Sequence, residues 1–147
     1  MRVEKTVHLK APIRTAWDVL VDPAAVGACV PGVEAVEIVD PTRFVVTLAV
    51  KVGVVRARFR VRVAVTETRP PYYLRSEGAG EEASPTSSLR ETTELHLDEA
   101  GPGETALRVV TDVDVFGPLG TFGYSVMKGK ADRMWDEFVT NLRRRIE

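Results

Sequence analysis

Residues 56–65 alternate with a period of two, and this pattern constrains the fold more than any other part of the sequence. Arginine occupies positions 56, 58, 60 and 62, and the neighbouring positions hold Phe59, Val61, Val63 and Val65. Successive side chains of a β-strand point to opposite faces of a sheet. The pattern therefore predicts a strand with one face in water and the other covered by a second layer of the protein.

Only one long segment has the periodicity of a helix, and it is the last one, from Pro118 to Ile146. On a helical wheel its apolar residues form one broad arc, which fits a helix laid across a large apolar surface. The arc contains Phe122, Gly123, Val126, Met127, Ala131, Met134, Trp135, Phe138 and Leu142. Pro118 suits a first-turn position, and the arginines at 143–145 suit the negative end of the helix dipole. We therefore expect this segment, from about Leu119 onward, to cover the sheet.

The rest of the chain consists of short predicted elements separated by turn residues. These are a strand over Arg2–Lys10, a short helix over Ile13–Val21, further helical turns over Ala24–Cys29, and strands over Val33–Asp40, Arg43–Val52, Val54–Thr68, Tyr72–Gly80, Ser87–Asp98 and Thr105–Phe116. Every connection between these strands is too short for a parallel crossover, so they should pair antiparallel. The predicted fold is α+β and forms a single domain over residues 1–147. In it, a curved antiparallel sheet of about seven strands wraps on a long C-terminal helix, with two short helices after the first strand.

Composition argues against several classes of function. The 147 residues carry a net charge of −1, so there is no basic excess for binding nucleic acid. No stretch approaches the roughly 20 apolar residues that span a bilayer, and the start of the chain has no apolar run of a signal peptide. The single cysteine, Cys29, cannot form an internal disulfide and fits a cytoplasmic protein. His8 and His96, both expected on the outer face of the sheet, lack the companion residues of a metal site, so no metal or other cofactor is expected.

Several local motifs accompany this order of elements. They are Ala11-Pro12 with Trp17, Leu20 and Asp22-Pro23, then Cys29-Val-Pro-Gly32-Val-Glu, Val52-Gly53-Val-Val, Pro70-Pro71 and Gly117-Pro-Leu-Gly120. With these motifs, nearly the whole chain resembles the helix-grip fold of the START/polyketide-cyclase (SRPBCC) superfamily. Within that superfamily it is most similar to the family of the carbon monoxide dehydrogenase G subunit, the CoxG family.

The resemblance implies a function class rather than an activity. Members of the superfamily bind hydrophobic or amphipathic ligands between sheet and helix, and some are cyclases, hydratases or dehydratases. The CoxG family is associated with the maturation or membrane recruitment of molybdenum hydroxylases and with quinone-like ligands. Many of its members continue beyond the last helix. This sequence stops at Glu147, so autonomous membrane anchoring is not expected.

Polar residues share the inward register of the predicted strands with the apolar ones. Ser76, Glu91, Thr93 and Thr111 fall among hydrophobic positions, and Lys130 comes from the helix. Because buried polar groups are costly unless they are paired, this set suggests a cavity that holds a ligand or solvent. The alternatives are that the hydroxyl residues are ordinary strand residues, that a bulge turns Glu91 outward, and that Lys130 extends its amine to the cavity mouth.

The predicted cavity lies toward the N-terminal half of the last helix, where Gly120, Gly123 and Gly129 reduce side-chain bulk and Met127 supplies an adaptable wall. The candidate ligand-binding residues are Phe59, Val61, Leu74, Ser76, Glu91, Thr93, Thr111, Val113, Phe122, Gly123, Val126, Met127, Lys130 and Met134.

These residues leave more than one function open. The favoured hypothesis is a non-enzymatic carrier of a hydrophobic, lipid- or quinone-like molecule, which could serve as an accessory to a molybdenum hydroxylase such as carbon monoxide dehydrogenase. The alternative is a small enzyme of the cyclase or dehydratase type with Glu91 as general acid/base. A third option is an interaction module with a filled core.

One surface feature also allows two interpretations. The arginine stripe (Arg56, Arg58, Arg60 and Arg62) is either a solvated face neutralised by acids such as Glu67 or Glu77, or a docking surface. A docking surface would contact an acidic protein partner or anionic lipid, which would place a cytoplasmic protein at the inner face of the membrane.

Overall fold

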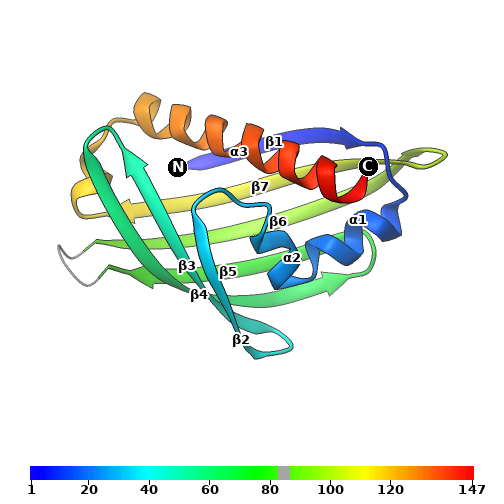
Figure 1. The fold of residues 1–147 in the computed structure, drawn as a ribbon, viewed down its shortest axis with the longest axis horizontal. Helices are drawn as coiled ribbons and strands as arrows, with labels where there is room; N and C mark the ends of the chain where they lie inside the picture. The colour runs from blue at the N-terminus through cyan, green and yellow to red at the C-terminus, as the bar shows by residue number, and fades with distance from the viewer. Residues whose placement is uncertain (83–86) are drawn as a thin grey trace.

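The computed structural model describes residues 1–82 and 87–147, which form one curved sheet and a helical layer (Figure 1). The strands are β1 Arg2–Leu9, β2 Val33–Asp40, β3 Arg43–Val52, β4 Val55–Arg69, β5 Tyr73–Glu81, β6 Ser88–Gly101 and β7 Glu104–Phe116. The helices are α1 Ile13–Leu20, α2 Pro23–Gly27, the 3-10 turn η1 Pro118–Thr121 and α3 Tyr124–Ile146. The predicted fold class, including the two short helices after the first strand, is confirmed.

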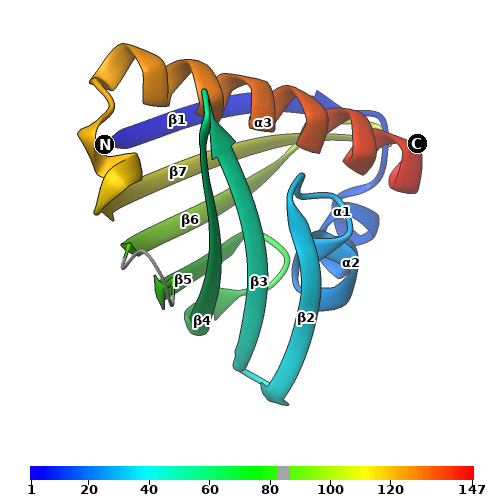
Figure 2. The ribbon, with the colours of Figure 1, turned by 60° about the vertical axis from the view of Figure 1, so that its left-hand side comes forward.

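All neighbouring strands pair antiparallel, in the order β1-β7-β6-β5-β4-β3-β2. From β2 to β7 each strand lies beside the one that precedes it in the chain, because the turns between them are short. Only β1 departs from this order and pairs with β7. Figure 2 shows the sheet curving beneath α3, with β1 and β7 nearest the helix. The long helix thus covers the concave face, as the sequence predicted.

The alternation of β4 separates the two faces of the sheet as predicted. Phe59 and Val61 are 1% and 5% exposed on the concave face, whereas the arginines beside them are exposed. Leu48 and Val46 of β3 stand directly opposite these two residues and continue the apolar wall. The covered face expected from the sequence is therefore a surface shared by adjacent strands.

Two separate apolar clusters close the ends of the layer beneath α3. The first cluster gathers Trp17, Leu107 and Leu142 with other buried residues, and Phe138 packs against it. The second cluster contains Phe59, Leu89 and Leu119, and Met127 and Phe122 pack against it. The residues of α3 that are buried are Val139 and Leu142, both in its C-terminal half. The helix is therefore held most firmly at its C-terminal end.

The last helix begins later than the sequence predicted. Instead of one helix from about Leu119, the chain makes the 3-10 turn η1, passes through Phe122 and Gly123 in extended backbone, and starts α3 at Tyr124. Gly117 has a φ of +90°, and a Cβ at Gly120 would lie 2.3 Å from the carbonyl oxygen of Val115. This tight packing of η1 on β7 interrupts the helix, and it is the reason for the glycines there.

Candidate ligand-binding cavity

A cavity of about 510 Å³ lies between the sheet and α3. Its walls are mostly valine, leucine, phenylalanine and methionine side chains from the concave face of β3–β7, from α3 and from the segment around α2. Binding pockets for small molecules typically measure about 300–1,000 Å³ and are predominantly apolar with a few polar groups. The core beneath α3 is thus hollow, and its size suits a small organic molecule.

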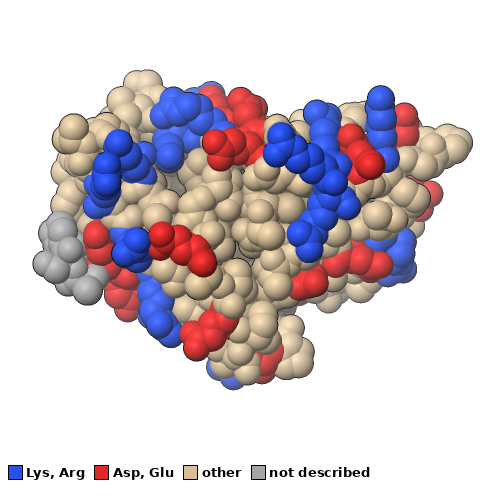
Figure 3. Space-filling view, viewed as in Figure 1, with Lys and Arg blue, Asp and Glu red and all other residues tan. Residues whose placement is uncertain are grey.

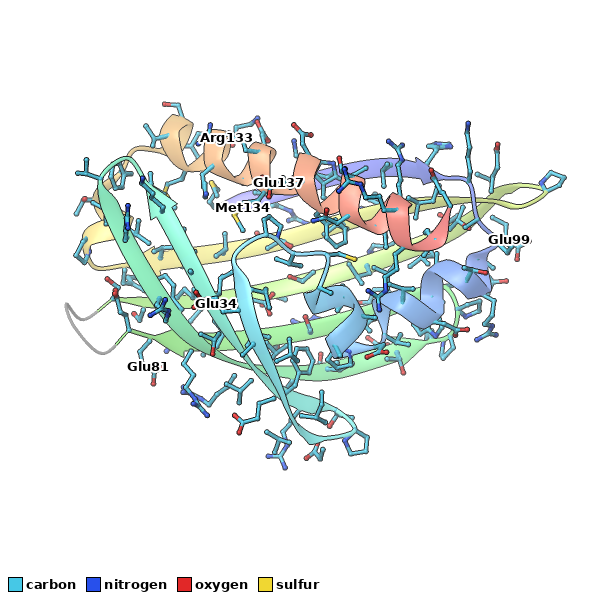
Figure 4. All side chains as sticks on the ribbon, in the orientation of Figure 1. Glu34, Glu81, Glu99, Arg133, Met134 and Glu137 are labelled. Carbon is cyan, nitrogen blue, oxygen red and sulfur yellow. The ribbon has the colours of Figure 1, made fainter. Side chains whose placement is uncertain are left out.

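Most of the predicted site residues line this cavity. They are Phe59, Val61, Leu74, Ser76, Glu91, Thr93, Thr111, Val113, Met127, Lys130 and Met134. Figure 4 shows Met134 below α3, between the helix and the strands. The structure therefore brings these side chains to one site, and their contact with a ligand stays a prediction.

Three predicted residues do not line the cavity. Val126 is 46% exposed, and a Cβ at Gly123 would meet no atom within 4 Å. Phe122 packs against the second cluster near the β3–β4 turn, where a Cβ at Gly53 would lie 4.0 Å from its Cζ. The prediction assumed one continuous helix and too wide an arc. At 100° per residue, Val126 lies about 120° from Phe138 and so points away from the sheet.

Sequence reasoning missed the part of the wall that comes from the segment between α1 and β2. Val26, Val30 and Pro31 line the cavity there. The turn that follows lies close to β3, since Gly32 has a φ of +89° and its carbonyl oxygen accepts a hydrogen bond of 2.8 Å from the backbone nitrogen of Ala49. The signal available in the sequence was the uncharged run over residues 24–31, which a purely solvated loop would not carry.

Polar side chains form a row across the floor of the cavity, which we call the carboxyl–threonine chain (Glu91, Thr93 and Thr111). Thr93 Oγ1 donates a hydrogen bond of 2.5 Å to Glu91 Oε2, and it lies 3.1 Å from Thr111 Oγ1. Thr93 stands opposite Thr111 of β7 in the strand register, with Ser76 of β5 on its other side. The row therefore provides linked polar groups within an otherwise apolar wall.

Glu91 points inward because β5 leaves space for it. Its partner in the register is Gly78, and a Cβ there would lie 2.7 Å from Glu91 Oε1 and 3.1 Å from Glu91 Cγ. The carboxylate side chain thus lies flat over the glycine. The alternative that a bulge turns Glu91 outward is wrong, since β5 and β6 pair in regular register through this position.

Burial raises the pKa of the Glu91 carboxyl, the hydrogen bond from Thr93 opposes this rise, and the nearby charge of Glu77 adds to it. Removing a carboxylate from water disfavours its charged form, which is why burial has the largest effect. Glu91 consequently holds a proton more readily than a glutamate on the surface does. This property suits a group that recognises a ligand or exchanges a proton with one.

Lys130 lines the cavity from α3, but it forms no ion pair with Glu91. Within residues 1–82 and 87–147, no carboxylate oxygen lies within 4.0 Å of the Lys130 amine. A second lysine of the lining, Lys5, has its Nζ 2.6 Å from Asp132 Oδ1, and Lys128 Nζ lies 3.1 Å from the other oxygen of the same carboxylate. These pairs lower the pKa of Asp132 and fasten β1 to α3.

Ion pairs occupy most of the arginine stripe. Arg58 pairs with Glu34 at 2.6 Å and Arg60 with Glu37 at 3.0 Å, both glutamates being in β2. Arg62 pairs with Glu81 at 3.2 Å. In the view of Figure 3, positive and negative side chains are interspersed and not sorted by sign.

The predicted partners of the stripe, Glu67 and Glu77, are wrong. They pair instead with Arg69 and Arg75. An irregularity in the β4–β5 register between Val65 and Glu67 separates Glu67 from the stripe, and the curvature of the sheet brings β2 within reach of β4.

Two further findings concern sites of other kinds. In the described part of the chain, no group of three or more histidine, cysteine, aspartate or glutamate residues is arranged to hold a metal ion. Over the same residues, no helix combines the length and the apolar character needed to cross a membrane.

The fold is similar to solved structures from several bacteria. A conserved protein from Geobacillus kaustophilus is 19% identical with a TM-score of 0.89, covering 98% of this chain and 93% of that one. A START superfamily protein from Mycobacterium smegmatis is 18% identical with a TM-score of 0.71, covering 99% and 96%. The Zhui aromatase/cyclase from Streptomyces sp. R1128 is 18% identical with a TM-score of 0.67, covering 97% and 91%. Identities this low establish the fold alone.

The fold and the cavity together define a ligand-binding protein of the START/polyketide-cyclase superfamily. The family model for the carbon monoxide dehydrogenase G subunit (CoxG) matches residues 6–147. The chain belongs to this family, which confirms the resemblance seen in its motifs. A search of curated protein sequences found no match.

Proposed function

We propose that this protein binds and carries a lipid- or quinone-like molecule in the cavity between the sheet and α3. The observation that carries the proposal is the cavity of about 510 Å³, with apolar walls and a single row of linked polar groups. Apolar walls favour the hydrophobic body of a ligand, and the polar row fixes the position of its head group. A filled interaction module would have side chains in that space.

The first test is native mass spectrometry of gently purified protein, followed by extraction and identification of any bound molecule. We expect an apolar compound with one polar end at a stoichiometry near one. If the protein carries no such compound and also fails to take up an added fluorescent apolar probe such as N-phenyl-1-naphthylamine, the carrier function is refuted.

A pair of variants tests whether the ligand occupies this cavity. Ala131 lines the cavity from α3, so Ala131→Phe places a ring in the space and should abolish probe uptake. Gly123→Leu adds similar bulk outside the cavity, where a Cβ meets nothing within 4 Å, and should leave uptake unchanged. Circular dichroism of both variants controls for folding. Equal effects of the two substitutions would place the ligand elsewhere.

Membership in the CoxG family supports a role as an accessory to a molybdenum hydroxylase such as carbon monoxide dehydrogenase. Affinity capture from the native host, with the Ala131→Phe variant as the matched control, tests this role. We expect components of a molybdenum hydroxylase to be recovered with the ligand-loaded wild type. Recovery of no such component argues against the role.

A docking role for the arginine stripe is a weaker proposal. Three of its four arginines already have carboxylate partners, which reduces the positive charge that the stripe offers to an acidic protein or an anionic membrane surface. Charge reversal at Arg56, whose side chain is exposed, should weaken such docking if it occurs. Unchanged sedimentation with anionic vesicles and unchanged partner capture would refute it.

A second candidate function is catalysis of the cyclase or dehydratase type, with Glu91 as general acid/base. Its support is the inward position of Glu91 and the rise of its pKa through burial. Glu91→Gln should then reduce turnover of a polyketide-like substrate by about a hundredfold or more, because an amide cannot exchange the proton. A carrier should keep its bound molecule chemically unchanged, which mass spectrometry of the ligand before and after incubation would show.

A further inference from the structure

The direction of the hydrogen bonds in the carboxyl–threonine chain follows from its distances. Thr93 donates to Glu91 Oε2 at 2.5 Å, and a hydroxyl group has a single proton to donate. The contact of 3.1 Å between Thr93 Oγ1 and Thr111 Oγ1 must then use the proton of Thr111. Both hydroxyl protons therefore point along the row toward Glu91.

This direction determines what the row presents to the cavity. With both threonine protons engaged, the groups that remain are Glu91 Oε1 and the lone pairs of the hydroxyl oxygens, all of which are hydrogen-bond acceptors. Within the described residues, Glu91 Oε1 receives no hydrogen bond, and the Lys130 amine is not within ion-pair distance of it. A buried carboxylate oxygen without a donor is costly, so a ligand that supplies one gains affinity.

The other polar groups of the cavity do not impose this preference. The hydroxyl of Ser76, which has no hydrogen bond to another described residue, can donate or accept with equal ease. Lys130 can only donate, and it does so from the opposite wall. Discrimination against ligands without a donor therefore depends on Glu91.

We infer that the carboxyl–threonine chain makes the cavity selective for ligands whose head group carries a neutral hydrogen-bond donor, such as an alcohol or a phenol. Where a hydroxyl and a carbonyl form of one molecule interconvert, as in alcohol and ketone or hydroquinone and quinone, the hydroxyl form binds more tightly. This inference rests on the proposed function and adds to it the chemistry of the head group.

A matched ligand pair tests the inference. The alcohol 2-tridecanol and the ketone 2-tridecanone have the same carbon skeleton and differ in a hydroxyl against a carbonyl. Their dissociation constants are measured at pH 8 by displacement of N-phenyl-1-naphthylamine from the cavity. We expect wild type to bind the alcohol about tenfold or more tightly than the ketone, as a hydrogen bond to a charged group allows. Equal affinities overturn the inference.

Two variants identify the group responsible. In Glu91→Gln the side-chain amide can turn its NH₂ group toward a carbonyl, so the preference should fall to within about threefold while the probe still binds. In Lys130→Met the preference should persist, since Lys130 accepts no hydrogen bond. Loss of the preference in Lys130→Met but not in Glu91→Gln overturns the inference. If wild type binds neither the ligands nor the probe, the carrier function and the inference fail together.

Discussion

Gly78→Ala tests whether the glycine in β5 exists to accommodate the Glu91 side chain. The backbone at Gly78 is not in the left-handed region, so alanine is compatible with it. The added Cβ would lie 2.7 Å from Glu91 Oε1, 3.1 Å from Glu91 Cγ and 3.2 Å from Val61 Cγ1. The carboxylate is the flexible neighbour and must move, which breaks its hydrogen bond with Thr93.

The size of the effect follows from two opposing terms. Loss of a hydrogen bond to a charged group costs about 1.5–3 kcal/mol. Replacing glycine by alanine at a compatible position stabilises a protein by about 0.4–1 kcal/mol, because the unfolded chain loses freedom. Gly78→Ala should therefore lower the free energy of unfolding by about 1–2 kcal/mol. In a Glu91→Ala background the same substitution should be neutral or stabilising by up to about 1 kcal/mol.

The assay is urea denaturation of wild type, both single variants and the double variant, which form a double-mutant cycle. The coupling between positions 78 and 91 should be about 1.5–3 kcal/mol. Gly80→Ala is the matched control, since its Cβ would lie 2.8 Å from the carbonyl oxygen of Arg60, which belongs to the backbone of β4. Its cost should not depend on Glu91. A coupling below about 0.5 kcal/mol between positions 78 and 91 would refute the reasoning.

Three further perturbations test the packing and the charges around the cavity. Phe138→Ala should lower the free energy of unfolding by about 2–3 kcal/mol, less than for a fully buried ring because Phe138 borders the cavity, and urea denaturation showing a loss below about 0.5 kcal/mol would mean that the ring does not pack on the first cluster. Because burial raises the pKa of Glu91 above its ordinary value of 4.5, the folded state binds more protons there than the unfolded state, so this group's contribution to stability should fall as pH rises from 4.5 through the folded pKa and then stay constant. Subtracting the pH profile of Glu91→Gln from that of wild type should isolate this negative slope, and a flat or positive difference would contradict it. Asp132→Asn should loosen β1 from α3 and lower the melting temperature more at low than at high salt, and a salt-independent effect would rule out the pairs with Lys5 and Lys128 as its cause.

The elements that a regular pattern defines could be predicted from the sequence, and so could the residues that those elements point inward. The alternation around Phe59 and Val61 assigned the concave face of β4, and the same period placed Glu91, Thr93 and Thr111 on that face. A strand has a period of two, so one correct assignment determines the orientation of every residue along it.

The parts that depend on tertiary packing could not be predicted in this way. The interruption at Phe122 and Gly123 arises because η1 packs on the backbone of β7 at Gly120, a contact between residues that no helical wheel represents. The contribution of Val30 and Pro31 to the cavity depends on how the following turn lies against β3. The partners of the arginine stripe depend on the curvature of the sheet.

The uneven support of α3 has a consequence for how fast a ligand can enter and leave. Val139 and Leu142 hold the C-terminal half of the helix in the first cluster, while Met127, Lys130 and Ala131 in the N-terminal half border empty space. A segment with fewer buried contacts opens locally at a fraction of the free energy of global unfolding. Exchange of the cargo therefore requires only that the weakly held half of α3 swing away, and release rate and overall stability can be altered by separate sets of mutations.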